Sequence, residues 1–224
     1  MQTMLVSPLL KASAEGPVSS ESEDLIHLRQ GDLDGACGPY CMVSALIALG
    51  LMTRKSAKNM DQWDGRTREG RFRDALYAFG VLSSEGTNGD DLQWLTDHFK
   101  GVGLQARHVE GAKKQVFNNV ADAIESGDMP IIGVEWPGGG GHWMLAVGFQ
   151  GVLIEGELQL THLLCLDPSQ ELPKVSLWNS VLEVFDDQGS SVNQGRMSSN
   201  HWGMGGELGK CQIKDTVILS VSKR

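Results

Sequence analysis

CGPYCMVSALIALGL, residues 37–51, carries the apolar pattern of a buried helix. Its large apolar side chains recur at the spacing of a helix that is covered on most of its surface; they are Met42, Val43, Leu46, Ile47, Leu49 and Leu51. Pro39 is tolerated in a first helical turn, and Gly50 suits the end of a helix. The stretch therefore predicts a helix over residues 38–51 that begins directly after Cys37.

Further helical patterns follow this stretch, and strand patterns come later. Residues 72–79, 90–99 and 116–125 have helical spacing, whereas 131–135, 143–149, 160–166 and 212–220 are short runs of β-branched or bulky apolar residues. Helices first and strands later predict an α+β domain, in which a helical half packs on an antiparallel β-sheet. A site between two such halves lies in a cleft.

One domain is expected for most of the chain. The 224 residues are 41% hydrophobic and 21% charged, which is an ordinary globular composition. Residues 11–24, KASAEGPVSSESED, are small, polar and acidic, so we expect 1–24 to be a flexible N-terminal tail and 25–224 to be the domain. Residues 186–206, rich in Ser, Gly, Asn and Asp, are expected to form a long surface loop.

The charge of the chain argues against two classes of partner. A net charge of −9 disfavours nucleic acid and anionic membrane surfaces unless a separate basic face exists. Residues 54–73 are the one candidate for such a face, with seven Lys and Arg against three Asp and Glu. A solvated helical face is the favoured interpretation. The alternative is a docking patch for a regulatory or acidic protein partner.

The apolar runs and the cysteines indicate where the protein is expected to work. No run approaches the ~20 apolar residues of a membrane span, and the N-terminal apolar run lacks a preceding positive charge. The four cysteines, at 37, 41, 165 and 211, do not have disulfide-scaffold or zinc-site spacing. We expect free thiols in the cytoplasm, or export without a cleaved signal peptide.

Cys37 is the first residue with a chemical interpretation. It lies between the loop of residues 30–36 and the predicted helix, where the helix dipole and free backbone N–H groups favour a thiolate. Gly38 allows a substrate to approach closely. For Cys37 taken alone, a buried structural cysteine is the favoured interpretation.

His142 is the second such residue. GGGGHWMLAVGF, residues 138–149, places it at the start of a strongly apolar strand, after four glycines that leave room for a ligand. Its ring is expected at the strand end, where the cleft opens. The alternative is a histidine satisfied within the core or a loop.

Two further residues complete the set of candidates. Asp167 ends the strand that should lie beside the His142 strand, and a carboxylate there can orient the imidazole; the alternative is an ordinary Asp-Pro turn. The side-chain amide of Gln30 could donate to an oxyanion together with the backbone N–H of Cys37.

Structural interpretations are available for several other residues that could have a chemical role. Cys41, one turn after Cys37, is expected in the core, with a resolving thiol as the alternative. Trp136 either borders a substrate groove or packs in the core. The remaining histidines have no partners at ligand spacing and are interpreted as ordinary: His27, His98, His108, His162 and His201.

Taken in order, these segments resemble a known family. CGPYC at 37–41, residues 123–134, GHW at 141–143 and LDP at 166–168 are similar to the bacteriocin-processing peptidases, which remove double-glycine leader peptides. The resemblance implies a papain-like fold and hydrolysis of a peptide bond without metal or cofactor. It implies Cys37 as nucleophile, His142 as base and then acid, Asp167 as orienter and Gln30 as oxyanion donor.

The sequence also departs from that family. Gln30 stands seven positions before Cys37, whereas the family's glutamine usually stands six before. Either the loop through Gly31 and Gly35 bulges by one residue, or Gln30 is not the donor. The membrane and ATPase domains of the leader-processing transporters have no counterpart here, and their leader-peptide substrate is not carried over. A stand-alone protease of this kind could act as an effector or toxin.

Two rival functions remain open at this stage. One is another acyl-transfer reaction on the same scaffold, by an amidase, deamidase, transglutaminase or isopeptidase. The other is a catalytically silent papain-like module used for binding. A peptide or protein is the expected substrate in the favoured interpretation.

Overall fold

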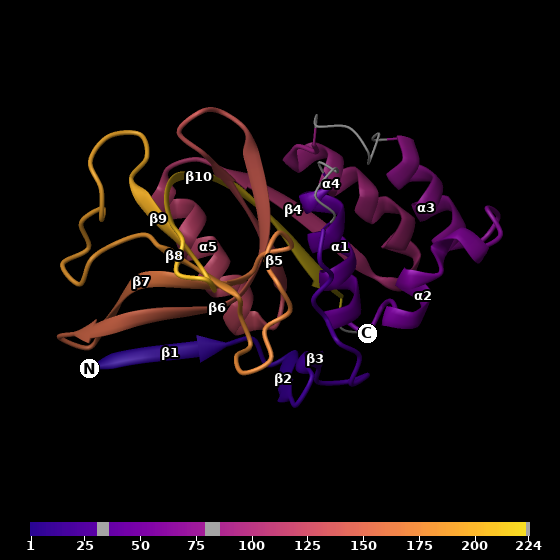
Figure 1. The fold of residues 1–224 in the computed structure, drawn as a ribbon, viewed down its shortest axis with the longest axis horizontal. Helices are drawn as coiled ribbons and strands as arrows, with labels where there is room; N and C mark the ends of the chain where they lie inside the picture. Colours follow the sequence, from indigo (N-terminus) through magenta and orange to yellow (C-terminus); the bar gives the residue numbers. More distant parts are fainter. Residues whose placement is uncertain (31–35, 79–85, 223–224) are drawn as a thin grey trace.

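The computed structural model describes residues 1–30, 36–78 and 86–222, and Figure 1 shows its helices and strands. The helices are α1 (Cys37–Ala48), α2 (Arg54–Lys58), α3 (Arg68–Ala78), α4 (Gly89–Leu95) and α5 (Lys113–Ser126), with 3-10 turns η1 (Met60–Gln62) and η2 (Thr96–Val102). The strands are β1 (Gln2–Val6), β2 (Leu10–Ser13), β3 (Gly16–Ser19), β4 (Leu104–Glu110), β5 (Met129–Glu135), β6 (Gly141–Ile154), β7 (Glu157–Leu166), β8 (Ser180–Glu183), β9 (Ser199–Gly203) and β10 (Leu208–Val221).

The main sheet is antiparallel and closes on itself. Within the described ranges, its strands pair in the order β6-β5-β10-β9-β8-β7, and β7 pairs back with β6 to complete a ring. β1 extends this sheet from β6 and β4 extends it from β10, while β2 and β3 form a separate hairpin. The ring leaves few open edges among these strands, which stabilises them against slippage.

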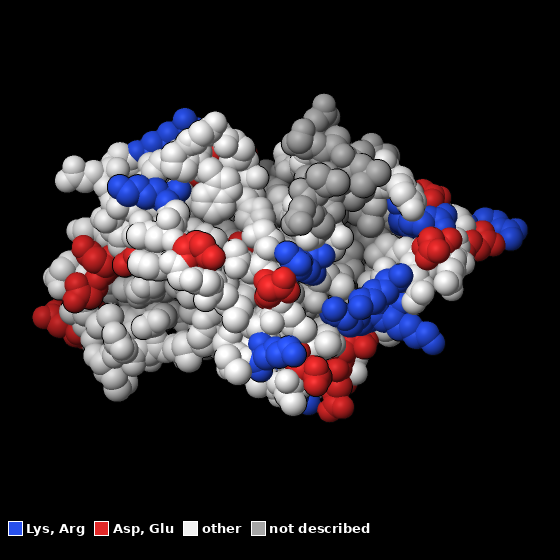
Figure 2. All heavy atoms as spheres, viewed as in Figure 1, with Lys and Arg blue, Asp and Glu red and all other residues white. Residues whose placement is uncertain are grey.

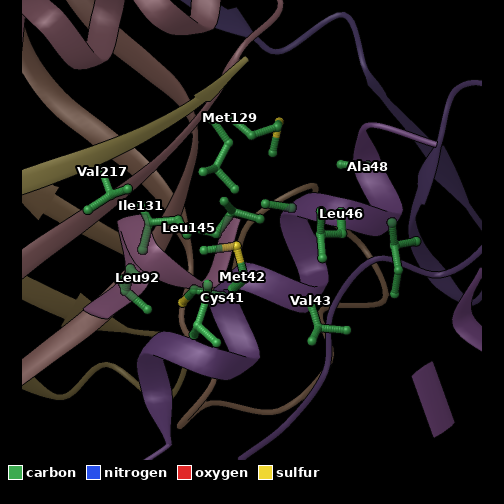
Figure 3. Close-up of a cluster of buried hydrophobic side chains, with 14 of the residues drawn as sticks. Cys41, Met42, Val43, Leu46, Ala48, Leu92, Met129, Ile131, Leu145 and Val217 are labelled. Carbon is green, nitrogen blue, oxygen red and sulfur yellow. The ribbon is translucent and has the colours of Figure 1, made fainter. Parts of the chain in front are cut away.

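Two hydrophobic cores lie on opposite faces of the central strands. Ile131 and Leu145 face α1, whereas their neighbours Ile132 and Met144 share the second core with α5. This alternation follows from the two-residue period of a strand. Figure 3 shows Met42 of α1 directed at Ile131 and Leu145, so α1 is fixed against the strands β5 and β6.

The predicted class is confirmed as a helical part combined with an antiparallel sheet. The helix predicted over 38–51 is α1, and it stops at Ala48 because Gly50 takes a left-handed conformation with φ 69°. The closure of the sheet was not predicted, and β4, β8 and β9 were missed. β9 lies inside the predicted surface loop of 186–206, where its polar sequence hides a strand that pairs on both sides.

The flexible tail predicted for residues 1–24 is wrong. β1 pairs with β6 over five residues, and β2 and β3 form a hairpin whose Ser19 is fully buried. The backbone of Ser7 also donates to Val147 of β6 over 2.8 Å. Backbone pairing, which small and acidic side chains permit, holds this segment in place.

Across the described part of the chain, no helix is long and apolar enough to cross a membrane.

Candidate active site

Cys37 is the first residue of α1 and is 6% exposed. The helix has no side-chain N-cap bond and no acidic residue in its first turn. Within the first turn of α1, no carboxylate therefore offsets the positive end of the helix dipole, which acts on the Cys37 thiol.

His142 is the second residue of β6 and lies between two other residues of the site. Its Nε2 is 2.7 Å from Asp167 Oδ1, and its side chain is also hydrogen-bonded to Cys37. Because Nε2 faces Asp167, Nδ1 is the ring nitrogen left for the thiol. Gly139 and Gly140, both with positive φ, form the turn that leads into β6.

Asp167 directly follows β7 and is 1% exposed. Ser169 donates to its Oδ1 twice, from the backbone N over 2.8 Å and from Oγ over 2.7 Å. Asn179, equally buried, accepts from the backbone N of Asp167 over 2.6 Å and donates to its carbonyl over 3.0 Å. The carboxylate is thus held by its own turn and by β6.

Cys37, His142 and Asp167 form a hydrogen-bonded row, in which the charges of His142 and Asp167 stabilise each other. Burial by itself lowers the pKa of His142, but the hydrogen bonds and charges of Asp167 and Cys37 outweigh it and raise that pKa to about 10. Burial raises the pKa of Asp167, yet its bonds from His142, His201 and Ser169 bring it well below the usual range. At neutral pH the arrangement therefore holds an imidazolium against a carboxylate.

Gln30 lies beside the Asp167 turn, because its backbone N donates to Pro168 O over 2.7 Å. Residues 31–35, including the predicted bulge through Gly31 and Gly35, lie outside the described residues. The role of Gln30 as oxyanion donor stays a prediction. The structure brings the other three candidates, Cys37, His142 and Asp167, into one hydrogen-bonded row.

Two histidines interpreted as ordinary are not ordinary. His201 Nε2 lies 3.1 Å from Asp167 Oδ2, and His108 bonds to Asp90 and Asp215. His201 was missed because it comes from β9, far from Asp167 in sequence, in a segment without an apolar pattern. Asn179 and Ser169 were missed as well, although Ser169 follows the Asp-Pro turn directly.

Trp136 covers the site from the strand side. Its ring stacks on His142 at 6.0 Å between centroids and meets His201 edge-on at 5.3 Å. It also packs against the core that contains α5. Both interpretations of Trp136 thus apply in part, since it is a core residue that also borders the site.

The other three cysteines are buried away from this row. Burial raises the pKa of Cys41 and Cys165, and it raises that of Cys211 to about 12. Thiols held in this neutral form are poor nucleophiles. Cys41 Sγ donates to Trp143 O over 3.4 Å, in agreement with a structural role.

A pocket of about 260 Å³ opens next to His142. Thr87 borders it from the helical part, and Gly133, Glu135 and Asp215 border it from the sheet. A larger, more apolar pocket of about 340 Å³ lies around Pro39 and Tyr40 of α1, but neither His142 nor Asp167 lines it. Of these two pockets, the smaller one contacts the imidazole.

One group of side chains has the composition of a metal site. Ligand atoms of His108, Glu110 and Asp215 lie within 4.8 Å of one another. His108 also has Asp90 at 3.1 Å from Nδ1 and Asp215 at 2.9 Å from Nε2, so a protonated imidazole satisfies both carboxylates without an ion. Burial lowers its pKa, but these two bonds outweigh burial and raise it.

Arginine side chains of the basic stretch, residues 54–73, form hydrogen bonds within the protein. The Arg54 guanidinium donates to the carbonyls of Leu25 and His27, and Arg73 donates to that of Trp63. In Figure 2, Lys and Arg atoms gather around the position of α2, with Asp and Glu atoms beside them. The docking of an acidic partner on this stretch stays a prediction.

Comparisons with known proteins give likenesses among solved structures. No protein-family model and no curated protein sequence matches the chain. Among solved structures, the crystal structure of UfSP from C. elegans is similar at 14% identity and a TM-score of 0.48, covering 97% of this chain. The chain spans about a third (34%) of the length of that structure.

Proposed function

We propose that this chain is a cysteine-dependent hydrolase of papain-like type that cleaves a peptide or amide bond. The observation that supports this most directly is the row of hydrogen bonds in which His142 joins Cys37 to Asp167. A nucleophile beside a base that a third group orients is the arrangement required for covalent acyl transfer.

In the acylation step, the Cys37 thiolate attacks the carbonyl carbon, and the new C–S bond leaves a tetrahedral oxyanion. The backbone N–H of Cys37, at the start of α1, is the proposed first donor to that oxygen, and Gln30 is the proposed second donor. The C–N bond then breaks as the His142 imidazolium gives its proton to the leaving amine. Asp167 holds the ring in position throughout.

In the deacylation step, neutral His142 removes a proton from water, and the water oxygen attacks the thioester. The C–S bond breaks, the acid product leaves, and the thiolate–imidazolium pair is restored. No redox change occurs in either step. His142 gives its proton to the leaving amine in the first step and regains one from water in the second.

The first experiment measures whether Cys37 is an activated thiol. An epoxide probe for cysteine peptidases is incubated with the wild-type protein, and the modified residue is located by mass spectrometry. We expect Cys37 to be labelled, the Cys37→Ala variant to stay unlabelled, and the matched Cys211→Ala control to be labelled like wild type. Labelling of Cys37 no faster than Cys211 would favour a binding module without catalysis.

A cleavage screen identifies the bond. The wild-type protein and Cys37→Ala are each incubated with a proteome and with purified peptidoglycan, and new termini are found by mass spectrometry. New protein termini that need Cys37 support a peptidase, whereas products from the cell wall alone would assign an amidase. The predicted effector or toxin role depends on which of these substrates is cleaved.

A further inference from the structure

Asp167 is bonded by two histidines, one at each carboxylate oxygen. His142 Nε2 lies 2.7 Å from Oδ1, and His201 Nε2 lies 3.1 Å from Oδ2. The side chains of both histidines are 11% exposed and that of Asp167 is 1% exposed. A buried carboxylate oxygen without a hydrogen-bond donor lowers stability. His142 bonds to Oδ1 only, and His201 supplies the donor for Oδ2.

His201 is held rigidly by the closed sheet. It lies in β9, opposite Leu182 of β8 on one side and Gly209 of β10 on the other. Backbone pairing on both sides of a strand fixes the direction of its side chains. The Nε2 of His201 therefore has a fixed position, and its hydrogen bond fixes the position of Asp167 Oδ2.

Trp136 links the two imidazoles from a third direction. Its ring centroid is 6.0 Å from that of His142, nearly parallel at 29°, and 5.3 Å from that of His201 at 72°. The turn of Gly139 and Gly140 holds it there, since Trp136 N donates to Gly140 O over 3.1 Å. The indole covers both histidines and strengthens their bonds to Asp167 by excluding water.

We propose that His201 is a positioning residue of the site: its Nε2–H donates to Asp167 Oδ2 and fixes the plane of the carboxylate so that Oδ1 accepts from His142. This inference rests on the proposed function. His201 touches neither the substrate nor Cys37, and it acts through Asp167. The two bonds from Ser169 hold the carboxylate at Oδ1. Without His201, the Oδ2 side of the carboxylate can tilt about that oxygen, and the imidazolium of His142 loses part of its orientation.

The test compares two substitutions of His201. His201→Gln keeps an N–H donor at nearly the same reach, whereas His201→Leu keeps the volume and removes the donor. We expect His201→Leu to lower kcat, and the rate of Cys37 labelling by the epoxide probe, by about 10- to 100-fold, the range for loss of a hydrogen bond to a charged group. KM stays within about twofold, and His201→Gln recovers most of the rate.

His162→Leu is the matched control. It removes a half-buried histidine from β7 whose Nδ1 bonds to Thr161 Oγ1 over 2.8 Å, and it should leave the labelling rate unchanged. If His201→Leu does not fold, His201→Asn, whose amide is one bond shorter, replaces it. Equal rates in wild type and a folded His201→Leu, or a His201→Gln as slow as His201→Leu, would overturn the proposal.

An NMR titration separates this inference from the proposed function. In a Cys37→Ala background, where no catalysis occurs, the pKa of His142 is measured with and without His201→Leu. We expect a lower pKa when His201 is lost, because Asp167 stabilises the imidazolium less well. An unchanged value overturns the positioning role even if the chain is a hydrolase. A fall of the pKa in a chain whose Cys37 is never labelled by the epoxide probe overturns only the hydrolase.

Discussion

Cys41 Sγ donates a hydrogen bond to the backbone oxygen of Trp143 over 3.4 Å, and this bond joins α1 to β6 beside the site. Cys41 is one turn after Cys37, and Trp143 directly follows His142. The bond therefore fixes the helix that carries one member of the row against the strand that carries the next.

Cys41→Ala should lower stability and spare the chemistry. Losing a buried sulfhydryl bond and a sulfur atom costs about 1–2 kcal/mol of the free energy of unfolding, measured in urea. The rate of Cys37 labelling should fall no more than about tenfold. Complete loss of labelling in a folded variant would instead give Cys41 a direct chemical role.

Gly38→Ala should impair the site, because there is no room for a side chain there. An added Cβ would lie 2.3 Å from Thr87 Oγ1 and 3.1 Å from the Trp143 ring. We expect a loss of about 1–3 kcal/mol in stability and slower Cys37 labelling, since the first turn of α1 must shift.

Gly138→Ala is the control for that substitution. No atom lies within 4 Å of its added Cβ, and its φ is not positive. Its melting temperature and labelling rate should equal those of wild type. If Gly38→Ala and Gly138→Ala have the same melting temperature and labelling rate, the close contact at Gly38 affects neither stability nor the site.

The activity should persist into alkaline solution. With the pKa of His142 raised to about 10 by Asp167 and Cys37, the imidazolium that protonates the leaving amine is present through neutral pH. We expect kcat/KM, which reports the groups of the free protein, to be level between about pH 7 and 9 and to fall as the pH rises through about 10. A fall centred near the ordinary histidine value of about 6.5 would contradict this assignment.

The free energy of unfolding should also depend on the protonation of His142, and it should fall as the pH rises. The folded-state pKa of His142 lies above its unfolded value of about 6.5, so the folded protein binds the proton more tightly. The stabilisation is complete below about pH 6.5 and is lost as the pH rises toward about 10. Denaturation curves of wild type and His142→Gln should therefore converge over this window, and curves that stay parallel would contradict it.

Deleting residues 1–24 should destabilise the protein. The deletion removes β1, which pairs with residues 148–152 of β6, and the hairpin of β2 and β3. We expect the melting temperature to fall by roughly 10 °C, because each 1 kcal/mol corresponds to about 2–4 °C in a chain of this length. Met4→Ala, at a 56% exposed side chain, is the control and should change it little. An unchanged melting temperature after deletion would restore the interpretation as a tail.

The fold could be predicted where the pattern of side chains carries the information. α1, α5 and the strands β5, β6 and β7 have apolar periodicities that their burial imposes, and each lies close to its predicted range. β8 and β9 were missed because backbone pairing forms them, and pairing leaves little trace in short sequences with few apolar residues. The closure of the sheet depends on these two strands.

The sequence by itself determined the order Cys37, His142 and Asp167, each at the end of a helix or strand, where a side chain can reach its neighbours. Only the tertiary structure decided that His142 bonds to both Cys37 and Asp167, and that His201 and Asn179 hold Asp167 from behind. The apolar periodicity of a helix or strand can be recognised from residues that are neighbours in the sequence. The donor to the second oxygen of the buried carboxylate comes instead from a distant strand, and the closure of the sheet brings it there.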